Sequence, residues 1–363
     1  MKIQKAPETM TSRERVKRTF DFEKTDRVPI DYSANEGIHA RLMAELGVSA
    51  NEALMEALGV DFRGIGAPYT GPELFKAPPN RRVDPLEGAV MRKVEHSSGY
   101  YWDFCDFPLQ DAEDEDFDAF PVPNPDHFDY DQALDRAKAY EGKYALFVGN
   151  PGIPDIINSN GRLMGMEDVL CHLLTGHEPA MRFIRRRAEF QLKMIERLLD
   201  KCKGHIDFLW LGEDLGTQIG PMIGLDLYRK TLRPIHKAFS DLAAAYKIPV
   251  MIHTCGSSSW AYEDFLEIGI TAVDTLQPEA KNMSPEYFSE HFGGRMNFHG
   301  CISTAGALAY GTVGDVEKVC RETLSVMMKN RGYHFAPTHA IQDNSPVENV
   351  IGMYQTAHDF GRY

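Results

Sequence analysis

The feature that most constrains this chain is the alternation of buried-strand and helical patterns from about residue 144 onward. Six short apolar runs have the composition of buried strands. The segments 178–202 and 284–292 lie between them and carry apolar residues at helical spacing. Repeated strand and helix patterns of this kind predict a parallel sheet. The six runs are "YALFVG" (144–149), "IDFLWLG" (206–212), "IPVMIHT" (248–254), "TAVDTL" (271–276), "RMNFHG" (295–300) and "GYHFAP" (332–337).

The same alternation begins near the amino terminus. "DRVPIDY" (26–32) has a strand pattern, and the amphipathic segment 37–47 follows it. The number of units fits an α/β fold of the (β/α)8 TIM-barrel type better than a short open sheet. Residues 64–130 interrupt the rhythm with prolines, aromatic residues and an acidic run, so we expect an inserted loop and hairpin region there. No long linker is visible, and we expect a single domain over residues 1–363.

Composition limits the classes of function. Hydrophobic residues make up 43% of the chain and charged residues 25%, as in a soluble globular protein. The formal net charge of −14 argues against nucleic acid or an anionic membrane as a partner. There is no apolar run long enough for a signal or a membrane span. Six scattered cysteines fit a reducing compartment. We therefore expect a cytoplasmic protein.

Two pairs of histidine and cysteine stand where predicted strands end. His253 and Cys255 are two positions apart, so they should point to the same face of a strand. His299 and Cys301 repeat this spacing, and Gly300 between them allows close backbone approach. Imidazole nitrogen and thiolate sulfur are good zinc ligands. His253, Cys255 and Cys301 are therefore the candidate ligands of a tetrahedral zinc site with one open position.

Other polar residues follow strands of the same predicted sheet. In a parallel barrel the carboxyl ends of the strands meet at one mouth, where chemistry takes place. Glu213 and Asp214 follow one strand, and we expect at least one of these carboxylates to act as a ligand or general acid. Gln277 and His339 follow two others. Tyr101 and Trp102, within the insertion, are candidates to cover a planar substrate.

Motifs along nearly the whole chain resemble the uroporphyrinogen decarboxylase superfamily. The segments that carry this resemblance are 10–32, 212–237, "HTCG" (253–256), "HGCIST" (299–304) and 339–357. The resemblance implies a (β/α)8 barrel with its active site at the carboxyl ends of the strands. The superfamily contains true decarboxylases and corrinoid-dependent methyltransferases.

The first strand separates these two branches. True decarboxylases carry a Gln-Ala-Gly-Arg segment after it, whereas this chain has "DYSANEGIHARL" (31–42). The methyltransferases carry a His-x-Cys motif, which His253 and Cys255 match, and a later metal-binding cysteine. His339 stands at the place of that cysteine. Either His339 is itself a ligand, or Cys301 supplies the thiolate and His339 faces the substrate.

The resemblance thus favours a zinc-dependent methyltransferase of the corrinoid-dependent O-demethylase type. It would move a methyl group from a small methylated donor, a methoxylated aromatic in the favoured version, to a corrinoid carried by a separate protein. Glu213, Asp214 and His339 would be the catalytic residues, and Gln277, Tyr101 and Trp102 would bind substrate. The alternatives are a carboxy-lyase resembling uroporphyrinogen decarboxylase and a non-catalytic binding barrel. A homodimer is also compatible with the sequence.

Overall fold

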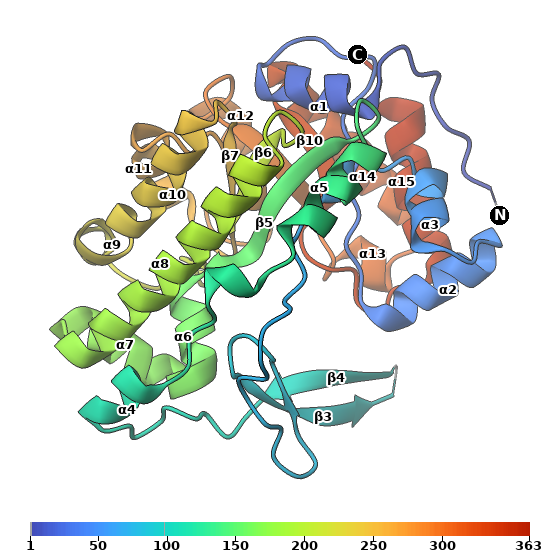
Figure 1. The fold of residues 1–363 in the computed structure, drawn as a ribbon. Coiled ribbons are helices and arrows are strands. Elements are labelled where there is room, and N and C mark those ends of the chain that lie inside the picture. The colour runs from blue at the N-terminus through green and yellow to red at the C-terminus, as the bar shows by residue number, and fades with distance from the viewer. Residues whose placement is uncertain (1, 98) are drawn as a thin grey trace.

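A curved parallel sheet forms the centre of the molecule (Figure 1). The computed structural model describes residues 2–97 and 99–363. Within these residues seven strands form the sheet in the order β1-β5-β6-β7-β8-β9-β10, and each strand is parallel to its neighbours. The six predicted runs correspond to β5–β10, so the parallel α/β sheet is confirmed. The bounds are β1 (Phe62–Gly64), β5 (Ala145–Pro154), β6 (Phe208–Gly212), β7 (Val250–Thr254), β8 (Ala272–Thr275), β9 (Asn297–Ile302) and β10 (Tyr333–Pro337).

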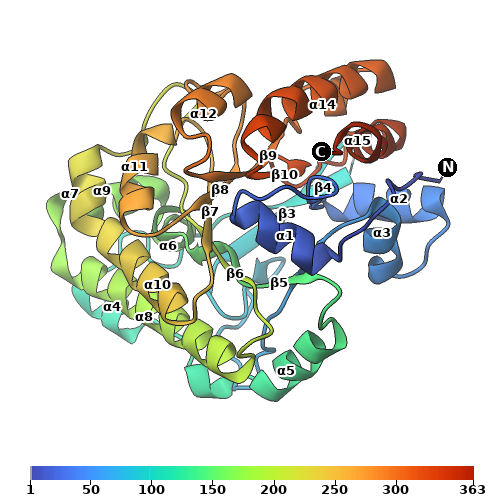
Figure 2. The same ribbon diagram turned by 90° about the horizontal axis from the view of Figure 1, so that it is seen from above.

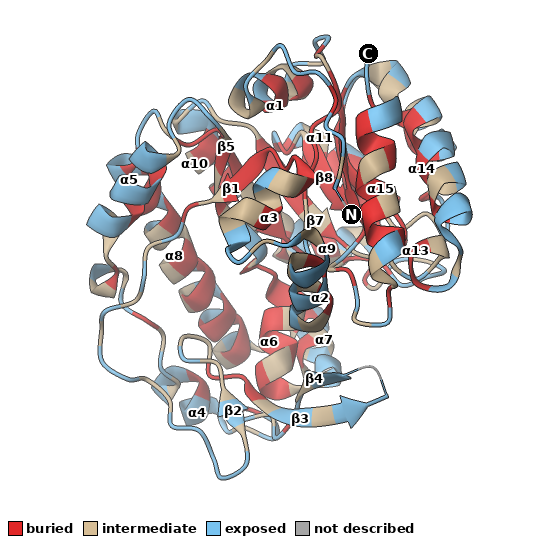
Figure 3. Cartoon of the chain, turned by 90° about the vertical axis from the view of Figure 1, so that its right-hand side faces the viewer, coloured by how far each residue is buried: buried red, intermediate tan, exposed pale blue. Residues whose placement is uncertain are grey.

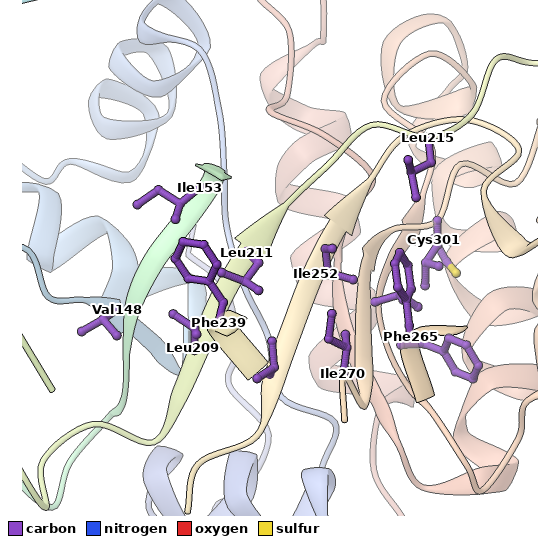
Figure 4. Close-up of a cluster of buried hydrophobic side chains, with 14 of the residues drawn as sticks. Val148, Ile153, Leu209, Leu211, Leu215, Phe239, Ile252, Phe265, Ile270 and Cys301 are labelled. Carbon is purple, nitrogen blue, oxygen red and sulfur yellow. The ribbon is translucent and has the colours of Figure 1, made fainter. Parts of the chain in front are cut away.

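Helices cover the outside of this sheet (Figure 2). A large cluster of buried apolar side chains fills the space between the two layers, and Figure 4 shows part of it. Burial on both faces explains why the strands are nearly continuous apolar runs. The helices are α1 (Ser12–Phe20), α2 (Glu36–Leu46), α3 (Asn51–Leu58), α4 (Asp114–Ala119), α5 (Tyr130–Ala139), α6 (Ile156–Met164), α7 (Met166–Thr175), α8 (Glu178–Lys201), α9 (Leu225–Thr231), α10 (Arg233–Ala245), α11 (Tyr262–Glu267), α12 (Pro285–His291), α13 (Ala307–Tyr310), α14 (Val313–Met327) and α15 (Val347–Phe360).

The amino-terminal end of the sheet is closed by α1, which lies across the strands in Figure 2. Its Val16 is fully buried and packs with Phe62 of β1 and Phe208 of β6 in a second, smaller apolar cluster. This packing leaves the opposite end, where the strands reach their carboxyl termini, for the site described below. No helix of residues 2–97 and 99–363 combines the length and apolarity needed to cross a membrane.

The predicted strand 26–32 is not a regular strand. It makes only isolated bridges among the described residues, one parallel from Ile30 to Phe335 of β10 and one antiparallel from Arg27 to Arg362. Phe335 donates its N–H to Pro29 O (2.7 Å), and Asp61, just before β1, donates its N–H to Ile30 O (2.9 Å). The segment therefore lies between β10 and the start of β1. Pro29 has no N–H and cannot donate to a ladder, which accounts for the broken pairing.

The insertion forms a three-stranded antiparallel sheet of β2 (Arg82–Val83), β3 (Val90–His96) and β4 (Gly99–Phe104). Figure 1 shows β3 and β4 beyond the end of the parallel sheet opposite α1. The Tyr100 hydroxyl donates to Glu36 of α2 (3.4 Å). The guanidinium carbon of Arg162, on α6, lies 4.9 Å from the ring centre of Phe104. The hairpin thus contacts elements from two different parts of the chain.

Candidate functional site

A cavity of about 860 Å³ opens at the carboxyl ends of the strands. The polar residues in its wall come from successive strands. His253 belongs to β7, Asp274 to β8 and His299 to β9, while Asp214 follows β6 and His339 follows β10. The sequence places these residues far apart, and the parallel order of the strands brings them to one end of the sheet.

Asp214 and His253 of this wall, together with the neighbouring Cys255, have the chemistry of a metal site. Ligand atoms of Asp214, His253 and Cys255 all lie within 4.8 Å of one another. His253 Nε2 is 3.4 Å from Cys255 Sγ and 3.9 Å from Asp214 Oδ1. Nitrogen, sulfur and oxygen are the three ligand types that zinc accepts in proteins, and three protein ligands leave a fourth position open. The described residues therefore contain a set of donors that fits a catalytic zinc ion.

The local backbone explains how this group is assembled. The alternation of strand side chains puts His253 and Cys255 on the cavity side, while Thr254 between them is fully buried on the other face. The backbone N–H of Cys255 donates to Asp214 Oδ1 (2.8 Å), and Asn158 of α6 donates to Asp214 Oδ2 (2.8 Å). Both oxygens of Asp214 are thus held in place beside the thiol.

A chain of carboxylates and imidazoles orients His253. His253 Nδ1 donates to Asp274 Oδ2 (2.7 Å), and His299 Nδ1 donates to Asp274 Oδ1 (2.6 Å). His299 Nε2 donates in turn to Asp31 Oδ2 (3.0 Å). Asp274 therefore fixes the ring of His253 so that Nε2 faces Cys255 and Asp214.

The charges in this chain stabilise one another. Burial lowers the pKa of His299, but Asp274 and Asp31 outweigh it and raise this pKa to about 9. The pKa of His253 is likewise raised, because Asp274 and Cys255 outweigh the cost of burial. Burial raises the pKa of Asp274, but His299 and His253 lower it below its usual range. His299 has a carboxylate at each ring nitrogen, so its protonated form suits its surroundings.

His339, after β10, lies close to His253. Its ring centre is 6.2 Å from that of His253, and it lines the cavity. Burial lowers the pKa of His339, and the neighbouring His253 lowers it further. A neutral imidazole is therefore favoured at this place in the wall.

Glu213 and Asp214 are neighbours in sequence but have different surroundings. Glu213 is fully buried and accepts the backbone N–H groups of Ile156 and Ile157 (2.8 and 2.9 Å), at the start of α6. His236 Nε2 lies 3.2 Å from the same carboxylate. Burial raises the pKa of Glu213, and the two N–H groups partly oppose that rise. Glu213 thus holds the amino terminus of α6 and does not line the cavity, whereas Asp214 does.

Comparison with known proteins agrees with this architecture. The sequence model of the family "Uroporphyrinogen decarboxylase (URO-D)" matches residues 162–360, more than half of the chain. The chain belongs to the uroporphyrinogen decarboxylase family. The match includes β6–β10 and hence His253, Cys255, Asp274, His299 and His339. The resemblance predicted from sequence motifs is confirmed at this level.

The fold of this family member is also found in a solved structure, and two other structures superpose less well. A methyltransferase from Methanosarcina mazei superposes with a TM-score of 0.67 at 16% identity, covering 97% of this chain and 99% of its own. An IolI protein with a bound zinc atom superposes with a TM-score of 0.32 at 12% identity, covering 63% of this chain and 90% of its own. A sugar phosphate isomerase/epimerase from Parabacteroides distasonis superposes with a TM-score of 0.29 at 11% identity, covering 64% of this chain and 89% of its own. No curated protein matches the sequence significantly.

The structure does not bring Cys301 to the other proposed ligands of this family member. Cys301 is buried in the apolar core, where Figure 4 draws it with Leu215 and Phe265. The alternation of strand side chains fails here because Gly300 and Cys301 both have positive φ (116° and 69°). A Cβ on Gly300 would lie 2.5 Å from Thr275 O, so the close approach requires glycine. Asp214 occupies the place in the ligand group that the sequence suggested for Cys301.

The residues expected to bind substrate also lie elsewhere. The Gln277 side chain accepts the backbone N–H of Gly256 (2.7 Å) and so fixes the loop after Cys255. Tyr101 is 49% exposed on β4, and Trp102 follows it there. None of these three residues is in the cavity wall. Gln277 lies in the loop after β8, whereas Tyr101 and Trp102 lie in the β3–β4 hairpin, which contacts α2 and α6.

Sequence reasoning missed several residues of the wall, among them Asp274 and four residues that bear on the substrate. Phe62, Phe147 and Trp210 provide aromatic surface from β1, β5 and β6. Asp155 is also buried there, with φ of 41°, and its Oδ1 has no hydrogen-bond partner among the described residues. Burial raises the pKa of Asp155, and Glu213 raises it further. Phe147 and Trp210 lie in predicted strands, which was a usable signal, whereas Phe62 lies in a strand that was not predicted and nothing in the sequence marks Asp155.

Proposed function

We propose that this protein is a zinc-dependent methyltransferase that moves a methyl group from a methoxylated aromatic compound to a corrinoid carried by a separate protein. The observation that carries the proposal is the position of His253 Nε2, which faces Cys255 Sγ and Asp214 Oδ1 at the wall of a large cavity. The neighbour with the same fold from Methanosarcina mazei is a methyltransferase, which agrees with this proposal.

His253, Cys255 and Asp214 would hold the metal. Zinc at this place would act as a Lewis acid and stabilise negative charge that develops on the leaving oxygen. Asp274 would keep the His253 ring in the orientation that ligation needs, as carboxylates next to metal-bound histidines commonly do. Asn158 and the N–H of Cys255 would do the same for Asp214.

The shape and chemistry of the wall support an aromatic substrate. Phe62, Phe147 and Trp210 offer flat apolar surface to a planar ring. A methyl ether is hard to cleave because its oxygen is a poor leaving group. Transfer of the methyl carbon to a reduced corrinoid would leave the electron pair of the broken bond on the oxygen, which would then take a proton. His339 and Asp155 are the residues that we propose to face this oxygen.

Neither group needs to be charged for that role. The lowered pKa of His339 favours neutral imidazole, which can donate a hydrogen bond. The raised pKa of Asp155 favours the carboxylic acid, which can give up a proton to the leaving oxygen. We propose a positioning role for Glu213 instead of the catalytic role expected from sequence, since it holds α6, the helix that supplies Asn158.

We also infer that residues 28–31 take the place of the eighth strand of a (β/α)8 barrel. The barrel would form a single domain over residues 1–363. Their hydrogen bonds to Phe335 on one side and Asp61 on the other support closure of the sheet. The proposed corrinoid would enter with its own protein, because the sequence has no Asp-x-His-x-x-Gly segment of the kind that binds it.

Decarboxylation is the second candidate. Arg63, Arg136 and Arg162 line the cavity, and cationic groups there favour a substrate with carboxylates. Arg63 is already paired with Glu52 (2.7 Å), however. The same wall also contains the carboxylates of Asp31, Asp214 and Asp274. This acidic surrounding disfavours a substrate with many carboxylates, and it favours the methyltransferase.

The test combines metal analysis with an assay of both reactions. Purified protein is mixed with a reduced corrinoid protein and a panel of methoxylated aromatics, and the cobalt(I) absorption band is followed. We expect one zinc per chain and a loss of the band that depends on the donor. An unchanged band across the panel, together with release of carbon dioxide from a porphyrinogen, would replace the methyltransferase with the decarboxylase.

A further inference from the structure

A second cavity, of about 300 Å³, lies between α8 and the irregular end of β5. Asn150 and Gly152 line both this cavity and the larger one, so a short piece of β5 separates them. The rest of the wall comes from α8 and from the insertion. The volume of this cavity is at the lower end of the range for pockets that bind small molecules.

The buried stripe of α8 carries two polar residues at this cavity. Figure 3 shows that one side of α8 is buried, and the spacing of that stripe runs through Phe183, Arg187, Gln191 and Ile195. An amphipathic helix places apolar residues on such a stripe. Arg187 and Gln191 are nevertheless only 8% and 7% exposed, and both line the cavity.

The hydrogen bonds of these two side chains are incomplete within residues 2–97 and 99–363. Arg187 Nη2 is buried there without a hydrogen-bond partner. Arg187 Nη1 donates to Ser159 O (3.1 Å) and Asn160 Oδ1 (2.8 Å), and Glu87 Oε2 lies 3.8 Å from Nη2, beyond hydrogen-bond distance. The Gln191 carboxamide lines the same cavity and forms no hydrogen bond with another described residue. Burying an unpartnered guanidinium N–H costs stability. A ligand with a complementary polar group would offset that cost.

The charges of the wall select the ligand class. Arg187 is the positive group, and the carboxylates of Asp84 and Glu87 are the negative groups. Asp84 accepts the N–H groups of Leu86 and Glu87 and is thereby held in its turn. Two carboxylates against one guanidinium disfavour an anionic ligand. Unsatisfied donors on Arg187 and Gln191 favour an oxygen acceptor.

The apolar part of the wall selects the body of the ligand. Phe128 and Phe190 face the cavity as a pair, with ring centres 5.9 Å apart. Met194, Ile195 and Leu198 continue this surface along α8. We propose that the cavity is a second binding site, for a small uncharged molecule with an aromatic body and one carbonyl or hydroxyl oxygen held by Gln191 and Arg187.

Calorimetric titration with acetophenone tests this site, with benzoate as the charged analogue of similar shape. Gln191→Leu is the main variant, because it removes no protein hydrogen bond and should fold as well as wild type or better. We expect acetophenone affinity to fall several-fold in Gln191→Leu and about tenfold or more in Arg187→Met. Arg185→Met, on the exposed face of α8, is the matched control and should bind as wild type does.

Three outcomes would overturn the proposal. The first is equal acetophenone affinity in wild type and Gln191→Leu, which would place the ligand elsewhere. The second is no binding to wild type, which would mean that the cavity holds solvent. The third is tighter binding of benzoate than of acetophenone. In Cys255→Ser, which disrupts the proposed metal group, acetophenone binding should persist, so this test is independent of the methyltransferase proposal.

Discussion

The Nδ1 atom of His253 lies 2.7 Å from Oδ2 of Asp274, so the aspartate turns the other ring nitrogen toward Cys255 and Asp214. We predict that Asp274→Asn keeps all three ligands but weakens zinc binding by about 10- to 100-fold, as loss of such an orienting carboxylate usually does. Competition with a chromogenic chelator measures this affinity. Asp31→Asn removes a partner of His299 only and should have a much smaller effect. Equal zinc affinity of wild type and Asp274→Asn would contradict the orienting role.

The two cysteines of the repeated His-x-Cys spacing should behave differently. Cys255→Ser should lose most of the bound zinc, since a hydroxyl is a far poorer ligand than a thiolate. Cys301→Ser should keep it, because Cys301 lies in the apolar core. Elemental analysis after dialysis gives both values. Zinc retained by Cys255→Ser and lost by Cys301→Ser would reverse the assignment and restore the ligand set suggested by the sequence.

Glu213 and Asp214 provide a second matched pair. Glu213→Leu leaves the N–H groups of Ile156 and Ile157 without an acceptor, and we expect the free energy of unfolding to fall by about 2 kcal/mol or more. Asp214→Asn keeps the shape of the side chain and should change stability by less than about 1 kcal/mol while zinc is lost. Urea unfolding followed by circular dichroism compares the two. A stable Glu213→Leu protein would show that α6 does not depend on this carboxylate.

Asp61 should dominate the stability of the protein in acid. It is fully buried between Arg15 and Arg27, at 2.6 and 2.7 Å. Burial raises the pKa of Asp61, but Arg27 and Arg15 lower it further than burial raises it, and the pKa of Asp26, which also contacts Arg15, is lowered too. Both carboxylates therefore stabilise the fold above the unfolded-state pKa of about 4. That stabilisation is lost as the pH falls through their folded-state values.

The corresponding variant is Asp61→Asn. It removes the fully buried carboxylate that Arg15 and Arg27 share, and leaves Arg15 with Asp26 and Arg27 with Glu8. We expect a cost of about 3 kcal/mol, the low end for breaking a buried ion pair. Its unfolding free energy should also depend less on pH below 5 than that of wild type. Denaturant titrations at several pH values measure both effects. An unchanged acid dependence in Asp61→Asn would assign the acid sensitivity to other groups.

The sheet was predictable because its strands are continuous apolar runs, a pattern that depends only on burial. The segment between β10 and β1 was harder to predict. Residues 26–32 have the composition of a strand, but Pro29 removes a donor and only single bridges form. The sequence pattern alone therefore could not establish eight regular strand and helix units. The hydrogen bonds around Ile30 connect β10 to the start of β1.

The site was predictable where the strand period holds. His253 and Cys255 come together as their spacing suggested, but the third member of the group is Asp214 and not Cys301. Cys301 has the same spacing from His299, but positive φ at Gly300 and Cys301 turns the thiol away. Backbone conformation of this kind depends on the neighbouring strand, here on Thr275 O, so a local pattern cannot reveal it. Asp155 was missed for a similar reason, since its place depends on a bend at the end of β5.

The division of work between Glu213 and Asp214 limits how this site could be grafted onto another barrel. One carboxylate anchors α6 and the next reaches the thiol of Cys255, so a single inserted or deleted residue after β6 would exchange their directions. α6 in turn supplies the amide of Asn158 to Asp214. Moving the metal-ligand group to another barrel would therefore require β6, α6 and β7 together, with the lengths of their connecting loops unchanged. The β2–β4 insertion, in contrast, is the part of the chain where length could vary.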